Sequence, residues 1–476
     1  MRGVAGPGGG SPAVVPVPIE WRGTTRQVCG LYPWSAPGQL PMSGVPIGRH
    51  QSSGAVVCFD HVSWFRANRI SNPSMLILAR PGLGKSTLAA KIMLGLSAAG
   101  YLLLIPGDTK PDYVELTRAL GGRVATVRRS GGAALNPCDP GGMAAAASRI
   151  GGPAGEALAS EAIGRATVAV SGLVELSRKG QPVADYEEAA VSAGLRLAAG
   201  RLGRPPVLPD LLALFGDKPD EVRAVVLDRR SDDTYDTLLA PLQRSLLALL
   251  NGSFGDVFAR CVDRSAGEGS VPESGIAVPA VDIDTSQIKG GDAGFLAAVL
   301  MAAWSETYGQ VEAAQALADA GLAPRRRYCL CLDELWRVLN LGGSMPDRVN
   351  ELTRLNRTQG VGQIMITHSI RDLAGSGRAN VEGIEERAGA IVVGGVPKAE
   401  VTALDKVLTL TDAERRAVRS WWSDGGGFAE SRDLPPGAGK FLIKPSSEDP
   451  GIPVDVVLTS AERAWGGQNT NRAWDS

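Results

Sequence analysis

The sequence predicts an α/β fold with a mostly parallel central sheet and an inserted all-helical subdomain. Short, continuous apolar runs recur along the chain, and each leads into a glycine or into a stretch of helical periodicity. Such runs are typical of parallel strands that helices bury on both faces. Residues 141–266 interrupt this pattern, because their apolar residues recur only at helical spacing.

Nine apolar runs are expected to form the strands of the sheet. They are Met75–Ala79, Leu102–Ile105, Arg123–Val127, Val278–Ile283, Tyr328–Leu332, Gln363–Ile366, Ala390–Val393, Lys440–Ile443 and Val454–Leu458. Residues 41–60 precede them and combine turn signals with short apolar alternation. This pattern predicts a small β-hairpin lid before the core.

The strand pattern and its interruption also predict the domain organisation. Residues 1–40 are rich in Gly, Pro and Ser, and they are expected to form a flexible arm. The core domain is expected over residues 41–140 and 267–460, with the helical subdomain of residues 141–266 inserted into it. Residues 461–476 then form a C-terminal tail.

The composition argues against several classes of protein. The chain of 476 residues has a formal net charge of −1, which does not support a monomer surface that coats DNA by counterion release. The six cysteines are scattered and the three histidines lack zinc-ligand spacing, so buried free thiols are expected. No run approaches the roughly 20 apolar residues that span a bilayer. We therefore expect a cytoplasmic protein, which reaches the inner face of the cell membrane only through a partner.

A glycine-rich loop follows the first predicted core strand. Residues 79–86 read A-R-P-G-L-G-K-S, the Walker A pattern with alanine in its first position. Glycines allow successive N–H groups to approach a phosphate, and the following helix N-terminus adds a partial positive charge. Lys85 is predicted to reach the β- and γ-phosphates, and Ser86 to bind Mg²⁺. The residues predicted to hold ATP are Pro81, Gly82, Leu83, Gly84, Lys85, Ser86 and Thr87.

A second motif follows the strand Tyr328–Leu332, where Asp333 and Glu334 come directly after five apolar residues. This is the Walker B arrangement, and it places both carboxylates at the edge of the sheet where ligands bind in open α/β folds. Asp333 is predicted to hold Mg²⁺, and Glu334 to polarise the water that attacks the γ-phosphate.

The strand that ends at Ile366 leads into Thr367 and His368. A polar residue at this position would sense the γ-phosphate, and His368 is the predicted sensor, with Thr367 as the alternative. Arg354 and Arg357 lie three residues apart on one helical face, and either is a candidate to stabilise the transition state in a neighbouring subunit. A solvated helix surface is the competing interpretation for both arginines.

Further segments, taken with these motifs, resemble the conjugative type IV secretion traffic ATPases of TraC/VirB type, in the HerA–FtsK branch of RecA-like motors. The matching segments are Gly44–His50, Asp108–Tyr113, Leu135–Asp139, Asp282–Ser286, Asp333–Trp336 and Arg354–Gly360. They occur in the order of the family, over roughly residues 41–445. The chain departs from the family in having Thr367-His368 where Thr-Gln is usual.

The resemblance implies a RecA-like P-loop ATPase that uses ATP and Mg²⁺ and works as a homo-oligomer, expected to be a hexamer. It also implies hydrolysis that powers conjugative DNA transfer or type IV secretion. The expected partners are secretion-channel or membrane-anchored proteins, and DNA in the pore of the ring. Two alternatives stay open at this point: a DNA translocase of the coupling-protein or FtsK/HerA type, and a nucleotide-dependent assembly switch.

Overall fold

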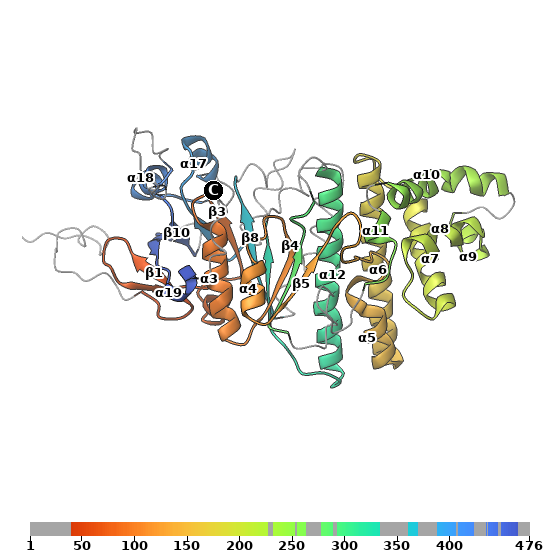
Figure 1. The fold of residues 1–476 in the computed structure, drawn as a ribbon, viewed down its shortest axis with the longest axis horizontal. Coiled ribbons are helices and arrows are strands. Elements are labelled where there is room, and N and C mark those ends of the chain that lie inside the picture. Colours follow the sequence, from red (N-terminus) through yellow and green to blue (C-terminus); the bar gives the residue numbers. More distant parts are fainter. Residues whose placement is uncertain are drawn as a thin grey trace, which may run out of the picture. The chain divides into compact units, whose positions relative to one another are not determined.

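The computed structural model describes most of the chain, and Figure 1 shows the arrangement of its elements. The described residues are 40–226, 232–252, 255–262, 278–288, 293–333, 360–369, 388–405, 408–422, 435, 437–445 and 449–464. The chain divides into a unit of residues 1–40 and a unit of residues 41–476. Glu334, Arg354 and Arg357 lie outside the described residues.

The second unit is built on an 11-stranded sheet, in the order β2-β1-β11-β10-β9-β3-β8-β7-β4-β6-β5. The parallel part comprises β3 (Ser74–Leu78), β4 (Leu102–Asp108), β5 (Arg123–Thr126), β6 (Ala280–Asp284), β7 (Tyr328–Leu332), β8 (Val361–Thr367) and β9 (Ala390–Val393). The antiparallel part comprises β1 (Pro46–His50), β2 (Val56–Cys58), β10 (Lys440–Lys444) and β11 (Ile452–Val456). Each of the nine apolar runs predicted to be strands coincides with a strand, with ends shifted by a few residues.

The hairpin of β1 and β2 differs from its prediction. It was expected to form a lid, but β1 pairs with β11 and β2 pairs with β1, so both strands extend the sheet in its own plane. The pairing of β1 with β11 joins the beginning of this unit to its end. A partner so far away in sequence leaves no local signal, which is why the edge position was missed.

Helices cover both faces of the parallel strands. They are α2 (His61–Arg66), α3 (Lys85–Ala98), α4 (Val114–Ala119), α12 (Ala293–Asp319), α17 (Lys398–Leu404) and α18 (Asp412–Ser420). Leu330 and Leu332 of β7 belong to the apolar cluster around α12, whereas Cys329 and Cys331 alternate to the opposite face. All four side chains are buried, as expected for a strand in the centre of a parallel sheet.

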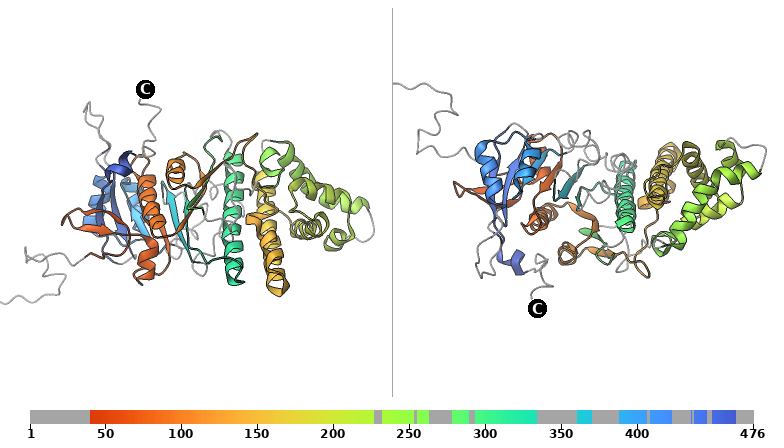
Figure 2. Two further views of the ribbon diagram at one scale, coloured as in Figure 1. Left: turned by 60° about the horizontal axis from the view of Figure 1, so that its bottom comes forward. Right: turned by 90° about the horizontal axis from the view of Figure 1, so that it is seen from above.

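The described residues between Gly141 and Val262 form helices and no strand. These are η1 (Pro140–Gly142), α5 (Met143–Ile150), α6 (Gly152–Ser177), α7 (Asp185–Leu202), α8 (Leu208–Gly216), α9 (Asp220–Val225), α10 (Asp232–Asn251) and α11 (Gly255–Phe258). Both views in Figure 2 place α12 between the sheet and helices α5 and α6. One cluster of buried apolar side chains continues from the sheet through α12 into α6, α8 and α10. The inserted subdomain of residues 141–266 stays a prediction as a unit, because its core is continuous with that of the sheet.

A buried ion pair joins the helical region to α12. The guanidinium of Arg165 on α6 binds both carboxylate oxygens of Glu312 on α12, and its Nε lies 2.9 Å from Oε2. The two side chains are 7% and 3% exposed. By length and hydropathy α6 is long and apolar enough to cross a membrane, yet 67% of its apolar window is buried. The buried charge pair and this packing identify α6 as a core helix.

The last described helix, α19 (Ser460–Ala464), lies against α3. Lys91 of α3 donates to both carboxylate oxygens of Glu462, at 2.7 and 2.9 Å, and both side chains are buried. The helix that follows the glycine-rich loop is thus held at its middle by the end of the described chain.

We predict that Arg165→Met lowers the free energy of unfolding by about 3–5 kcal/mol, because it leaves the Glu312 carboxylate buried without its counter-charge. Urea unfolding followed by circular dichroism measures this. Adding Glu312→Leu should restore most of the loss. The control is Arg201→Met, since Arg201 and its nearest carboxylate, on Glu221, are both exposed and lie 3.9 Å apart. A double variant as unstable as Arg165→Met alone would contradict the prediction.

Candidate functional site

The glycine-rich loop leaves the end of β3 and enters α3. Gly82 and Gly84 adopt positive φ angles of 82° and 92°, which glycine tolerates and which turn the backbone tightly between strand and helix. Lys85 is the first residue of α3, and its Nζ donates to the carbonyl oxygen of Ala79 at 2.8 Å. The ammonium therefore lies over the loop, at the place where a phosphate would bind.

The loop is supported from the β9 and β10 side of the sheet. The N–H of Arg80 donates to the carbonyl oxygen of Gly395 at 3.2 Å, and the N–H of Gly439 donates to that of Leu83 at 3.0 Å. The side chain of Leu83 is buried, while Pro81 and Gly82 are exposed at the tip of the loop. The exposed tip and partly exposed Ser86 and Thr87 leave the N-terminus of α3 accessible to a ligand.

The strand register aligns the predicted site residues at one edge of the sheet. Leu78 of β3 pairs with Thr367 of β8, and Leu332 of β7 pairs with Met365 of β8. The residues that follow these strands are Ala79, His368 and Asp333, so they lie at the carboxyl ends of three adjacent parallel strands. This edge is where open α/β sheets bind their ligands.

Asp333 is held by a residue from the segment that follows the neighbouring strand, β4, and precedes α4. The hydroxyl of Tyr113 donates to Asp333 Oδ2 at 3.3 Å. Tyr113 is fully buried, and burial together with the charge of Asp333 raises the pKa of its hydroxyl well above its usual value. The tyrosine therefore stays protonated and serves as a hydrogen-bond donor to the carboxylate. This role was not predicted, although Asp108–Tyr113 was among the segments that carry the family resemblance.

A set of further carboxylates lies beside Asp333, at the ends of β4 and β6. Asp108 pairs in register with Asp284. Burial raises the pKa of Asp108 to about 7, against the opposing effect of its hydrogen bonds from the backbone N–H groups of Tyr113, Asp112 and Lys110. Asp108 can therefore gain or lose a proton near neutral pH.

Asp282 lies inside β6 and is fully buried. Neither of its carboxylate oxygens has a hydrogen-bond partner among the residues that the structure describes. Burial, followed by the charges of Asp108 and Asp284, raises the pKa of Asp282 well above its usual value. Burial thus favours the protonated, uncharged form of this side chain.

The tip of β8 carries the two residues predicted as a γ-phosphate sensor. The hydroxyl of Thr367 is buried and donates to the carbonyl oxygen of Ser369 at 3.1 Å. The hydroxyl of Ser369 donates to Glu400 on α17 at 2.7 Å. These bonds fix the turn after β8, and His368 is left half-buried at its tip. The sensor function of His368 stays a prediction.

The donor set fits Mg²⁺ carried by a nucleotide. A hydroxyl from Ser86 and a carboxylate from Asp333 are the small number of protein ligands that Mg²⁺ uses when phosphates and water complete its shell. Among the described residues, no cluster of three or more His, Cys, Asp or Glu side chains could hold a metal ion by itself. Glu334, Arg354 and Arg357 cannot be placed in this geometry, because they lie outside the described residues.

The protein is similar in structure, but not detectably in sequence, to known proteins. No family model and no curated protein matches the sequence. The solved structure of VirB4 of Thermoanaerobacter pseudethanolicus aligns with a TM-score of 0.64 at 17% identity, over 90% of this chain and 100% of that chain. The plasmid coupling protein TrwB, in complex with a non-hydrolysable ATP analogue, aligns with a TM-score of 0.51 at 13% identity, over 90% and 96%.

Both likenesses extend over nine-tenths of this chain. The α/β fold class predicted from the sequence, with its mostly parallel sheet, is confirmed. The chain has the RecA-like P-loop fold of VirB4 and TrwB.

Proposed function

We propose that this protein is an ATP-hydrolysing motor that powers conjugative DNA transfer or type IV secretion. The observation that carries the proposal is the order β3-β8-β7 in a fold similar to that of VirB4. This order sets the phosphate-binding loop and Asp333 at the same edge of the sheet with one strand between them. ATP with Mg²⁺ is the proposed ligand, and the TrwB complex with an ATP analogue supports a nucleotide in this fold.

Each proposed site residue has one task. Lys85 neutralises charge on the β- and γ-phosphates, Ser86 and Asp333 hold Mg²⁺, and Glu334 polarises the attacking water. Tyr113 keeps the Asp333 carboxylate oriented through its hydrogen bond. His368 at the tip of β8 is proposed to sense the γ-phosphate.

An oligomer completes the proposed site. Arg354 or Arg357 of one subunit would approach the γ-phosphate held by its neighbour and stabilise the charge of the transition state. A ring, proposed to be a hexamer, provides such an interface at every site. We propose that the ring works in the cytoplasm at the inner face of the cell membrane, with secretion-channel or membrane-anchored proteins as partners and with DNA in its pore.

A DNA translocase of the coupling-protein type is the second proposed function. It is favoured by the likeness to TrwB, which also extends over 90% of this chain. The higher TM-score to VirB4 gives the first proposal its priority. The two functions differ in whether DNA is needed for rapid hydrolysis.

We predict that Lys85→Ala reduces ATP hydrolysis by roughly 100-fold or more, because it removes a preorganised positive charge from the reacting phosphates. A coupled phosphate-release assay on the purified protein measures this. Lys398→Ala is the matched control, since Lys398 is an exposed lysine at the start of α17. Full turnover by Lys85→Ala would show that the loop is not the site of hydrolysis.

Glu334→Gln is expected to keep ATP binding and to slow hydrolysis by roughly 100-fold or more, because the amide cannot act as a base toward water. Equilibrium binding of radiolabelled ATP and single-turnover hydrolysis separate the two steps. The complementary variant Asp333→Asn should instead weaken the dependence of binding on Mg²⁺. Normal turnover by Glu334→Gln would place the base at another residue.

The functional class is tested by steady-state ATPase activity with and without single- and double-stranded DNA, combined with light scattering for particle mass. We expect a ring-sized particle that hydrolyses ATP. DNA should change its rate of hydrolysis by less than about 2-fold, which is a difference of only about 0.4 kcal/mol in the barrier. Strong stimulation by DNA would replace this proposal with a DNA translocase. Nucleotide-dependent ring formation without turnover would favour an assembly switch.

A further inference from the structure

The residues proposed to bind phosphate and Mg²⁺ lie on the β8 side of the glycine-rich loop, and they leave its β9 side without an assigned role. In the sheet, β3 lies between β8 and β9, and β7 with Asp333 lies beyond β8. In the proposed site Asp333 would hold the Mg²⁺ that neutralises charge on the phosphates, so the γ-phosphate end of a bound nucleotide would face Asp333. The base and ribose would then extend in the opposite direction, toward β9 and β10.

Two tryptophans lie at the end of α18 on this side, and Trp422 contacts the loop. The guanidinium carbon of Arg80, the second residue of the loop, lies 5.3 Å from the ring centroid of Trp422. Trp421 is buried, whereas Trp422 is half-buried and Arg80 is exposed. The Arg80 guanidinium thus lies over the indole of Trp422, while the residue remains accessible to solvent.

Close backbone contacts at two glycines hold Trp421 in position. A Cβ atom added to Gly395 would lie 2.6 Å from the carbonyl group of Trp421 and 2.9 Å from Leu83 of the loop. A Cβ atom added to Gly437 would lie 1.8 Å from the carbonyl oxygen of Trp421. Glycine at both positions therefore allows the turn after α18 to close onto the phosphate-binding loop.

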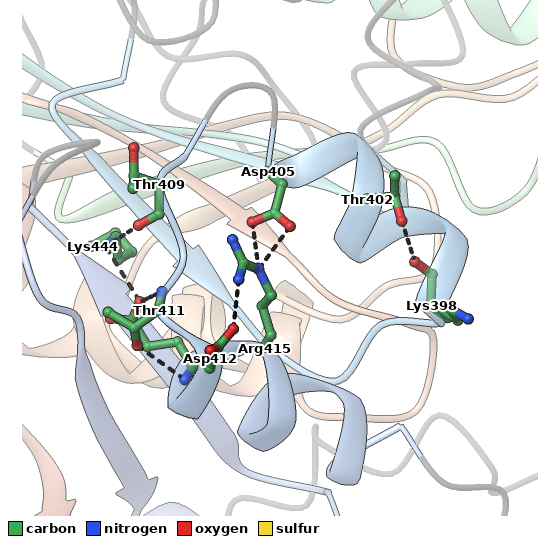
Figure 3. A network of polar contacts seen from close by, with 9 residues as sticks. Lys398, Thr402, Asp405, Thr409, Thr411, Asp412, Arg415 and Lys444 are labelled. Carbon is green, nitrogen blue, oxygen red and sulfur yellow. Dashed lines mark hydrogen bonds and ion pairs between the residues drawn. The ribbon is translucent and has the colours of Figure 1, made fainter.

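A polar network fixes the helix that carries the tryptophans, as Figure 3 shows. Arg415 of α18 binds Asp405 at 2.8 Å and Asp412 at 2.8 Å. Thr411 and Glu414 form a capping box at the start of α18. Lys444 of β10 is fully buried, donates to the carbonyl oxygen of Thr409 at 3.0 Å and lies 3.6 Å from Glu414. The helix is held to α17 and to the sheet, and its last turn is held in place with it.

We propose that Arg80 and Trp422 form a stacking shelf that binds the base of the nucleotide. This inference rests on the proposed nucleotide site and assigns its base-binding part. The planar guanidinium stacks on the π-face of a base, and the indole behind it holds the guanidinium in orientation. Stacking accepts any base, so the shelf accepts ATP and GTP with similar affinity.

The indole nitrogen offers a further contact. Trp422 Nε1 is shielded from solvent and has no hydrogen-bond partner among the described residues. An unsatisfied buried donor is unfavourable, and an acceptor on the base or ribose would satisfy it after a small movement of the indole.

The test compares a ligand that has a base with one that has none. Binding of a non-hydrolysable ATP analogue and of inorganic tripolyphosphate, both with Mg²⁺, is measured by isothermal titration calorimetry. We expect Trp422→Ala to lower the affinity for the ATP analogue by roughly 10-fold or more. Its affinity for tripolyphosphate should stay within about 2-fold of the wild-type value. Arg80→Lys, which keeps the charge and removes the plane, should do the same, and Trp422→Phe should retain most of the affinity.

Arg419→Ala is the control, because Arg419 is exposed on the last turn of the same helix. If Trp422→Ala and Arg80→Lys lower the affinity for both ligands equally, these residues only support the loop. Unchanged affinity for both ligands would also contradict the proposed shelf. Tripolyphosphate binding by the variants reports that the loop is folded. If the wild-type protein binds neither ligand, the proposed nucleotide site is contradicted, and the proposed shelf is contradicted as well.

Discussion

The parallel alignment of β3, β8 and β7 is the constraint on which the site depends. Parallel strands bring their carboxyl ends to one edge, so residues from three distant parts of the sequence meet there. Helices on both faces shield these strands from solvent, and the apolar side chains of β7 are all buried. The polar chemistry is confined to the residues that follow the strands, where backbone N–H groups and water are within reach.

Burial at this edge decides which acids carry charge. Asp282 has no hydrogen-bond partner among the described residues, and burial favours its protonated form. Asp108 receives three backbone N–H bonds, and its pKa is raised to about 7. Asp333 is less buried and is oriented by the buried Tyr113 hydroxyl. In the proposed site, Asp333 is the carboxylate available to a metal ion, while burial favours protonation of Asp282 and raises the pKa of Asp108.

The strands and the loop were predictable because their signals are local. A continuous apolar run defines a buried parallel strand, and the spacing of Gly82, Gly84 and Lys85 defines the turn into α3. The contacts of Tyr113 with Asp333, and of β1 with β11, join segments far apart in sequence and leave no periodic pattern. The strand order depends on such contacts, so the hairpin predicted as a lid proved to be a sheet edge.

The two sides of the loop illustrate the same difference. Chemistry on the β8 side depends on charged groups next to recognisable strands, so a motif can indicate it. On the β9 side, the contact of Arg80 with Trp422 depends on the close approach at Gly395 and Gly437 and on the network that holds α18. Arg80 occupies a position that the Walker A pattern leaves variable, and its role follows only from what packs behind it. In the proposed site, the motif therefore indicates where the phosphates bind, whereas packing determines how the rest of the nucleotide is held.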